Sequence, residues 1–150
     1  MLGGGRAEHQ TKRIDLQLSV NLRAIVLFYR ESLPLLRAAG TEHRNALVVN
    51  TSSISGKSGQ PWLSVYSATK AGVIGYTQAM NKELGGDGIK SVALAPGFVE
   101  TPMTEFVREH VPAEDMIRVE DVAEAVRFVL RTSPNCVIPE IVFQRPGETL

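Results

Sequence analysis

Apolar residues recur along the chain with distinct spacings, and these spacings predict its helices and strands. Over residues 13–39 they return every three or four positions, which is the period of an amphipathic helix, and Pro34 is expected to kink that helix. Residues 46–51 form a continuous β-rich run, as in a strand that is buried on both faces of a parallel sheet. The order of helix, polar loop and buried strand predicts an α/β layer structure.

The second half of the chain repeats this alternation. Residues 66–84 predict a helix with small residues on one face, and residues 89–95 predict a strand that Pro96 and Gly97 end. A short amphipathic segment follows at 102–116, and a further helix begins at Val119 and stops before Pro134. Residues 137–138 and 141–143 predict a last strand, or two short ones, interrupted at Pro139.

The first residues show no such periodicity. Residues 1–12 are polar and glycine-rich, and we expect a flexible leader there. The 150 residues, 43% of them apolar and 21% charged, are an ordinary composition for one domain with a hydrophobic core. No internal repeat is visible.

Charge and composition argue against several classes of partner. Sixteen basic residues balance sixteen acidic ones, so no basic field favours nucleic acid or an anionic membrane. No stretch has the length of a membrane span, and the start lacks the apolar core of a signal peptide. The single cysteine, Cys136, fits a reducing compartment and is expected to be a small buried apolar residue. We therefore expect a cytoplasmic protein.

A metal site has no support in the sequence. His9, His43 and His110 are scattered, and no pair has a ligand spacing. We expect all three to lie on the surface.

Tyr66 and Lys70 carry the clearest chemical signal. Their spacing of four places the phenol and the ammonium on one face of the helix predicted for residues 66–84. A neighbouring cation favours the phenolate, so we expect Lys70 to lower the pKa of Tyr66 and make it a general acid/base. Ser53 follows the strand predicted for residues 46–51, and active sites of open α/β sheets are built at such carboxyl ends.

Two further residues have both a structural and a functional interpretation. Asn21 falls off the apolar stripe of the first helix, where its amide could bond a helix carbonyl or hold a water. Trp62, in the loop between Ser53 and Tyr66, could line a substrate pocket or pack against the following helix.

At these positions the sequence resembles the short-chain dehydrogenase/reductase family. The signature of that family is a serine followed thirteen residues later by Tyr-x-x-x-Lys, here Ser53, Tyr66 and Lys70. The resemblance extends to Asn21 and to the stretch from Pro96 to Thr101, and it covers the chain from about residue 14 onward. It implies a Rossmann-like, doubly wound parallel sheet of about three strands with flanking helices.

The resemblance also implies roles for these residues. Hydride would pass between the nicotinamide of NAD or NADP and a small-molecule carbonyl or alcohol substrate. A catalytic tetrad would then consist of Asn21, Ser53, Tyr66 and Lys70. Cofactor contacts would come from six positions: Tyr66, Lys70, Pro96, Gly97, Val99 and Thr101. In the family, the helices matching residues 13–39 and 66–84 commonly pair between subunits, which implies a homo-oligomer.

One expected part of the family pattern is missing. The strand, glycine-rich turn and helix that hold the dinucleotide phosphates have no counterpart in the sequence. We therefore expect a single truncated domain over residues 1–150, with the strand at 46–51 exposed as an aggregation-prone edge. The alternative to an oxidoreductase is a catalytically inactive, truncated homologue that acts as a dimerising or structural partner.

Overall fold

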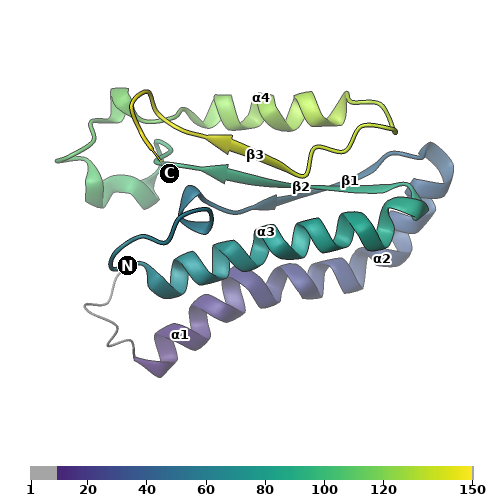
Figure 1. The fold of residues 1–150 in the computed structure, drawn as a ribbon, viewed down its shortest axis with the longest axis horizontal. Coiled ribbons are helices and arrows are strands. Elements are labelled where there is room, and N and C mark those ends of the chain that lie inside the picture. Colours follow the sequence, from purple (N-terminus) through teal and green to yellow (C-terminus); the bar gives the residue numbers. More distant parts are fainter. Residues whose placement is uncertain (1–9, 150) are drawn as a thin grey trace.

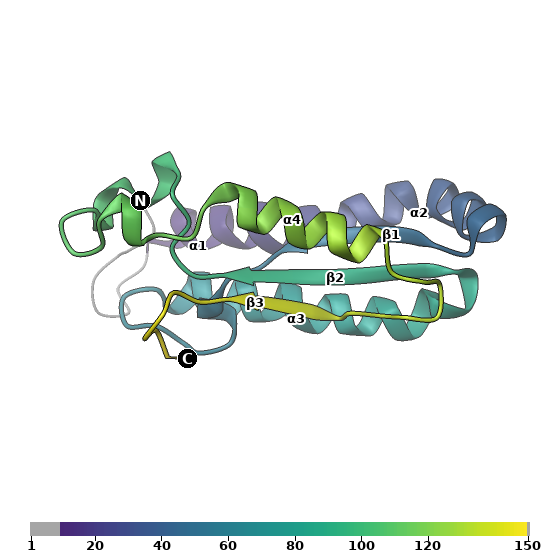
Figure 2. The same ribbon diagram turned by 90° about the horizontal axis from the view of Figure 1, so that it is seen from above.

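Residues 10–149 are described by a computed structural model, and within them three strands form one parallel sheet. The strands β1 (Ala46–Thr51), β2 (Ile89–Pro96) and β3 (Glu140–Phe143) lie side by side in that order. Helices cover both faces, with α2 (Ala24–His43) and α3 (Ser64–Leu84) on one and α4 (Val119–Leu130) on the other (Figure 1). Viewed from above, α4 runs along the strands (Figure 2). The predicted α/β architecture is confirmed.

The core lies on the two faces of β2, every residue of which is buried except its last. Tyr29, Leu84 and Ile89 join α2 and α3 to one face of the sheet. Val92 and Val129 join α4 to the other face. A strand covered on both sides has no solvent-facing positions, which explains the apolar run from Val92 to Ala95.

A polar cluster of four residues is buried between the sheet and its helices. The amide of Asn50 donates to the hydroxyls of Tyr29, at 3.0 Å, and Thr77, at 2.9 Å. Tyr29 donates in turn to the hydroxyl of Ser91 at 2.8 Å. Burial raises the pKa of Tyr29, and the hydrogen bonds to Ser91 and Asn50 act in the opposite direction. Each member of this Asn50 cluster is thus satisfied by another member, as buried polar groups require.

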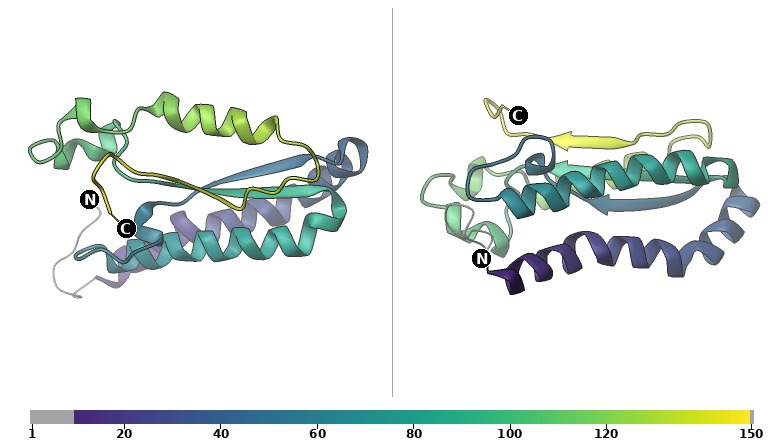
Figure 3. Two further views of the ribbon diagram at one scale, coloured as in Figure 1. Left: turned by 45° about the horizontal axis from the view of Figure 1, so that its top comes forward. Right: turned by 60° about the horizontal axis from the view of Figure 1, so that its bottom comes forward.

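The first predicted helix is correct in position but differs in form. It consists of α1 (Thr11–Leu18), one π-helical turn at Ser19–Arg23, and α2, which continues to His43. Figure 3 shows these parts as one long rod beside α3. The helix runs through Pro34, and the irregular turn lies at Ser19–Arg23. Of the predicted leader at residues 1–12, residues 1–9 lie outside the described residues, and the prediction is wrong for Thr11 and Lys12, which belong to α1.

Two predictions for the last residues are wrong. Residues 137–138 form no strand, and β3 begins at Glu140, because pairing with β2 starts only where Ala93 donates its N–H to the Pro139 carbonyl at 3.0 Å. Cys136 is exposed, contrary to expectation, because it lies in the connection that leaves the end of α4.

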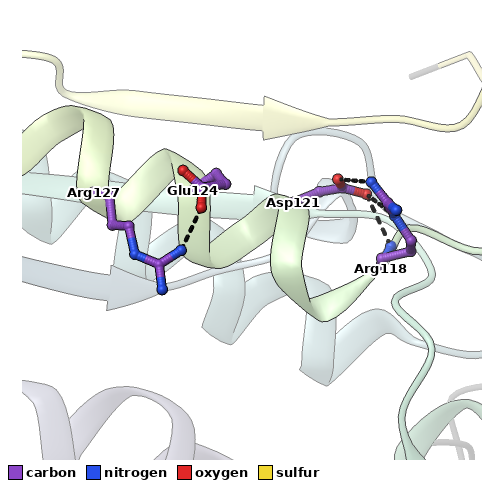
Figure 4. A network of polar contacts seen from close by, with 4 residues as sticks. All are labelled: Arg118, Asp121, Glu124 and Arg127. Carbon is purple, nitrogen blue, oxygen red and sulfur yellow. Dashed lines mark hydrogen bonds and ion pairs between the residues drawn. The ribbon is translucent and has the colours of Figure 1, made fainter.

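Exposed charged residues at the start and along α4 form ion pairs within single helical turns (Figure 4). Arg118 contacts Asp121 at 2.9 Å, and Arg127 pairs with Glu124. Asp121 also accepts the backbone N–H of Arg118 at 3.2 Å, which caps the start of the helix. None of the helices in the described part of the chain combines the length and apolar character that a membrane span requires.

Candidate active site

The predicted catalytic residues meet at the carboxyl ends of β1 and β2. Ser53 lies two residues beyond the end of β1, and Tyr66 and Lys70 lie in the first two turns of α3. Ser53 is buried, and its hydroxyl donates to the carbonyl of Pro96, the last residue of β2, at 3.3 Å. The same hydroxyl accepts the N–H of Ser55 at 3.2 Å. These bonds fix the serine where two strands end, the usual place for a site in an open α/β sheet.

Tyr66 is half-buried beside Ser53. Burial raises the pKa of its phenol, and a hydrogen bond with the Ser53 side chain acts in the opposite direction. The net shift is upward. Tyr66 therefore carries its proton at neutral pH.

Lys70 lies on the same face of α3 as Tyr66, as the spacing of four predicts. Its ammonium is 5.6 Å from the centroid of the Tyr66 ring and donates to the carbonyl of Thr51 at 2.9 Å. Burial lowers the pKa of Lys70 itself. The expected lowering of the Tyr66 pKa by Lys70 is wrong for this structure, because burial of the phenol outweighs any effect of the neighbouring cation.

Asn21 approaches the site from the π-helical turn at Ser19–Arg23. Its amide donates to the hydroxyl of Thr69 at 3.1 Å, and that hydroxyl donates to the Tyr66 carbonyl at 2.7 Å. Ala24 donates its N–H to the carbonyl of Ser19, five residues earlier, as in a π turn. Such turns occur frequently at functional sites. Thr69 thus joins Asn21 to the helical turn that carries Tyr66.

The segment that follows β2 crosses the same edge of the sheet. Gly97 donates its N–H to the Phe143 carbonyl at 2.9 Å, and Ile117 donates to the Phe98 carbonyl at 3.0 Å. Val99 accepts the hydroxyl of Thr104 at 2.7 Å. The stretch from Pro96 to Thr101, expected to contact the nicotinamide, is therefore held at the mouth of the site from both sides.

A groove of about 370 Å³ runs between the first helix and β1. Asn21 and Lys70 line it together with Thr51 at the end of β1. β1 is an edge strand of the sheet, since in the described part of the chain it pairs only with β2. Two of the four predicted catalytic residues, Asn21 and Lys70, therefore lie at an open side of the sheet. Their polar side chains could hold the nicotinamide end of a cofactor.

Two supporting residues had no assigned role in the sequence. A Cβ atom on Gly56 would lie 2.6 Å from the carbonyl carbon of Lys70, so only glycine lets this loop meet the backbone of α3. Ser52 donates its hydroxyl to the same Lys70 carbonyl at 2.8 Å. In the sequence, Gly56 and Ser52 are only a glycine and a serine in a polar loop. Neither residue type shows that its contact is with the backbone of α3.

His43, His110 and Cys136 take no part in this arrangement. His43 and His110 are exposed, and His9 lies outside the described residues. Over residues 10–149 no group of three or more potential metal ligands occurs.

Comparison with known proteins places the whole arrangement in one family. The family model described as short chain dehydrogenase matches residues 3–112. The chain is 34% identical over 136 residues to the 3-oxoacyl-(acyl-carrier-protein) reductase FabG of Thermotoga maritima, covering 85% of this chain and 54% of that protein. The chain thus spans about half the length of this curated relative.

Solved structures with a bound nicotinamide cofactor share the fold. The 3-ketoacyl-(acyl-carrier-protein) reductase of Brucella melitensis, complexed with NADH, is 26% identical with a TM-score of 0.80, over 94% of this chain and 59% of that one. ElxO with NADP bound is 25% identical with a TM-score of 0.79, over 95% and 60% of the two chains. The match of the family model over most of the chain, together with the Ser53, Tyr66 and Lys70 geometry, shows that this chain belongs to the short-chain dehydrogenase family.

Proposed function

We propose that the chain carries the catalytic centre of an NAD- or NADP-dependent oxidoreductase acting on a small carbonyl or alcohol compound. The observation that carries this proposal is the contact between the Ser53 and Tyr66 side chains, with the Lys70 ammonium 5.6 Å from the same phenol ring. The three groups come from two elements and meet at one sheet edge. The resemblance of the sequence and the names of its relatives support the same chemistry.

Each residue then has a role in carbonyl reduction. The bound cofactor supplies the hydride to the carbonyl carbon. Ser53 donates a hydrogen bond to the carbonyl oxygen, and Tyr66 transfers its phenolic proton to that oxygen as charge develops. A raised pKa suits this direction, because the phenol enters the reaction protonated.

Lys70 and Asn21 support this proton transfer. The Lys70 ammonium lies close enough to the ring to stabilise the phenolate that forms. Asn21 lies on the chain of hydrogen bonds through Thr69 to the turn of Tyr66, and by family resemblance it would anchor a relay water.

The groove beside β1 fits the nicotinamide end of the cofactor. Lys70 would bond the ribose, and the backbone of Val99 with the Thr101 hydroxyl would hold the carboxamide. Within residues 10–149 no glycine-rich phosphate-binding turn joins a strand to a helix, so this proposal assigns no residue to the phosphates.

Fluorescence titration of the full chain with NADH and with NADPH tests the proposal. We expect saturable binding of at least one nucleotide, weakened in Lys70→Met. Lys82→Met is the matched control, since Lys82 lies exposed on the same helix far from the site. Absence of saturation with both nucleotides, or equal loss in the two variants, would refute the assignment.

A second role, as a dimerising partner, is favoured by the outer face of α3. Ala68, Ala71 and Gly75 are exposed there, and a Cβ atom on Gly75 would meet no atom within 4 Å. A face of small residues lets another helix approach closely. We propose a homo-oligomer formed through this face.

A cytoplasmic location, consistent with the single cysteine, belongs to the same proposal.

A further inference from the structure

The loop between Ser53 and α3 ends in a tight turn that holds a tryptophan in an unfavourable backbone conformation. Leu63 donates its N–H to the Gln60 carbonyl at 3.2 Å, with Pro61 and Trp62 at the two central positions. The φ angle of Trp62 is 67°. Turns with proline second and a positive φ third usually place glycine at that third position, because a side chain is strained there.

Burial does not explain why a tryptophan occupies this position. Its side chain is 59% exposed, although a large aromatic residue normally contributes through the area it buries. The interpretation that Trp62 only packs against the following helix is therefore disfavoured. Strained residues in sparsely populated conformations cluster at ligand clamps and active sites.

The turn is fastened directly beside the catalytic tyrosine. Gln60 donates its N–H to the hydroxyl of Ser67 at 3.2 Å, and Ser67 donates its own N–H to the Leu63 carbonyl at 2.7 Å. Ser67 is buried and is the neighbour of Tyr66 in the first turn of α3. The whole loop lies beyond the arrowhead of β1, at the end of the sheet that holds the site (Figure 1). The turn that carries Trp62 is thus joined by hydrogen bonds to Ser67, the residue that follows Tyr66.

The same loop offers no free charge. Over residues 54–63 Lys57 is the only ionisable side chain, and its ammonium pairs with Glu140 at 2.8 Å. A substrate with a phosphate or carboxylate near this turn would find no unpaired cation on the loop. A flat apolar group would find the face of an indole, on which aromatic rings stack.

We infer that Trp62 is a specificity-determining residue that stacks on neutral carbonyl substrates with an aromatic body. This inference rests on the proposed function of the Ser53, Tyr66 and Lys70 site. A preference for neutral aromatic substrates would distinguish the chain from reductases whose substrates are acyl groups on an anionic carrier.

A binding experiment tests the inference without any turnover. Trp62 is the only tryptophan, so intrinsic fluorescence reports this turn alone. We expect acetophenone to quench the Trp62 fluorescence with saturation. Its affinity should be about three- to tenfold higher than that of cyclohexyl methyl ketone, which has a saturated ring in place of the aromatic ring. Equal affinities, or quenching that rises linearly without saturation, would overturn the inference.

Turnover gives a second and separate readout. In Trp62→Gly, which relieves the positive φ and should fold, we expect the ratio of kcat/KM for acetophenone over cyclohexyl methyl ketone to fall about three- to tenfold. Phe128→Ala is the control, because Phe128 is also 59% exposed but lies on α4. An unchanged ratio in Trp62→Gly would refute the role of Trp62. If neither ketone is reduced with NADH or NADPH, the proposed function fails for these ketones, and the fluorescence result decides the inference.

Discussion

Replacement of Gly56 by alanine should separate the loop that carries Ser53 from the helix that carries Lys70. The added Cβ would lie 2.6 Å from the carbonyl carbon of Lys70, 2.8 Å from its oxygen and 2.9 Å from the N atom of Ala71. Carbon contacts shorter than 3.0 Å essentially never occur, and all three atoms belong to helix backbone that cannot rotate away. Either the loop or the helix must therefore move.

The cost follows from this overpacking. Forcing an extra methyl group into a filled space destabilises a protein by about 1–3 kcal/mol. For a chain of this size, each kcal/mol lowers Tm by about 2–4 °C, so we expect a fall of several degrees. Thermal unfolding followed by circular dichroism, with urea unfolding to obtain the free energy, measures both quantities.

The same loop supplies the control. Gly59→Ala adds a methyl group where no atom lies within 4 Å, and Gly59 does not have a positive φ. We expect its stability to stay within about 0.5 kcal/mol of the original chain. If Gly56→Ala were as stable as Gly59→Ala, the close contact between loop and helix would not exist in solution. A stable Gly56→Ala with full nucleotide affinity would also remove the loop from any role in shaping the site.

Four other outcomes follow from the structure. Trp62→Gly should be more stable than Trp62→Ala by about 1 kcal/mol in urea unfolding, because only glycine tolerates φ of 67° freely, and the reverse order would contradict the strain. Tyr66→Phe should abolish carbonyl reduction while nucleotide affinity persists; retained activity would exclude Tyr66 as the proton donor. The folded-state pKa of Tyr66 is raised above 10.0, so its contribution to stability is complete below pH 10 and lost above it. As the pH rises past 10, the free energy of unfolding in urea should therefore fall more for the original chain than for Tyr66→Phe. Parallel pH profiles of the two proteins would contradict the shift. Lys90→Met should lower Tm, because the buried Lys90 ammonium donates to the Thr132 hydroxyl at 3.1 Å and to the Ser133 carbonyl at 3.0 Å. Lys82→Met, at an exposed position, should leave Tm unchanged. Equal Tm values for the two variants would mean that the Lys90 bonds do not contribute to stability.

The open edge of β1 bears on assembly in solution. Within residues 10–149, β1 pairs with β2 alone, which leaves one row of its backbone groups open to another chain. Exposed Phe28 and Val20 lie along the adjacent groove. We expect a marginally stable chain that associates at this edge or through the outer face of α3. Sedimentation with thermal melting measures both properties. A strictly monomeric chain with a sharp transition at high temperature would contradict this expectation.

Hydrophobic periodicity was sufficient to predict most of the elements. The strands at 46–51 and 89–95 and the helices at 66–84 and from Val119 are present within one or two residues of the expected bounds. The π-helical turn at Ser19–Arg23 could not be predicted, because a change of hydrogen-bond partner over one turn barely alters the spacing of apolar residues. Exposure of Cys136 was missed because residue type predicts burial only on average.

The proximity of the proposed site residues was predictable from the sequence, and the direction of the Tyr66 pKa shift was not. The spacing of four brought Tyr66 and Lys70 to one face, and the end of an apolar run placed Ser53 beside them. The direction of the Tyr66 pKa shift was predicted wrongly because a sequence shows the neighbouring cation but not the burial that outweighs it. The role of Gly56 depends on a contact with Lys70 backbone that only the folded chain reveals.

The Asn50 cluster constrains how this sequence can change over evolutionary time. Hydrogen bonds join Tyr29, Asn50, Thr77 and Ser91, so replacing any one of them by an apolar residue removes a bond from at least one buried partner. Replacing all four with well-packed apolar residues would remove that penalty, and the effects of the single changes would therefore be far from additive. A route of single substitutions from this cluster to an apolar core therefore passes through less stable intermediates.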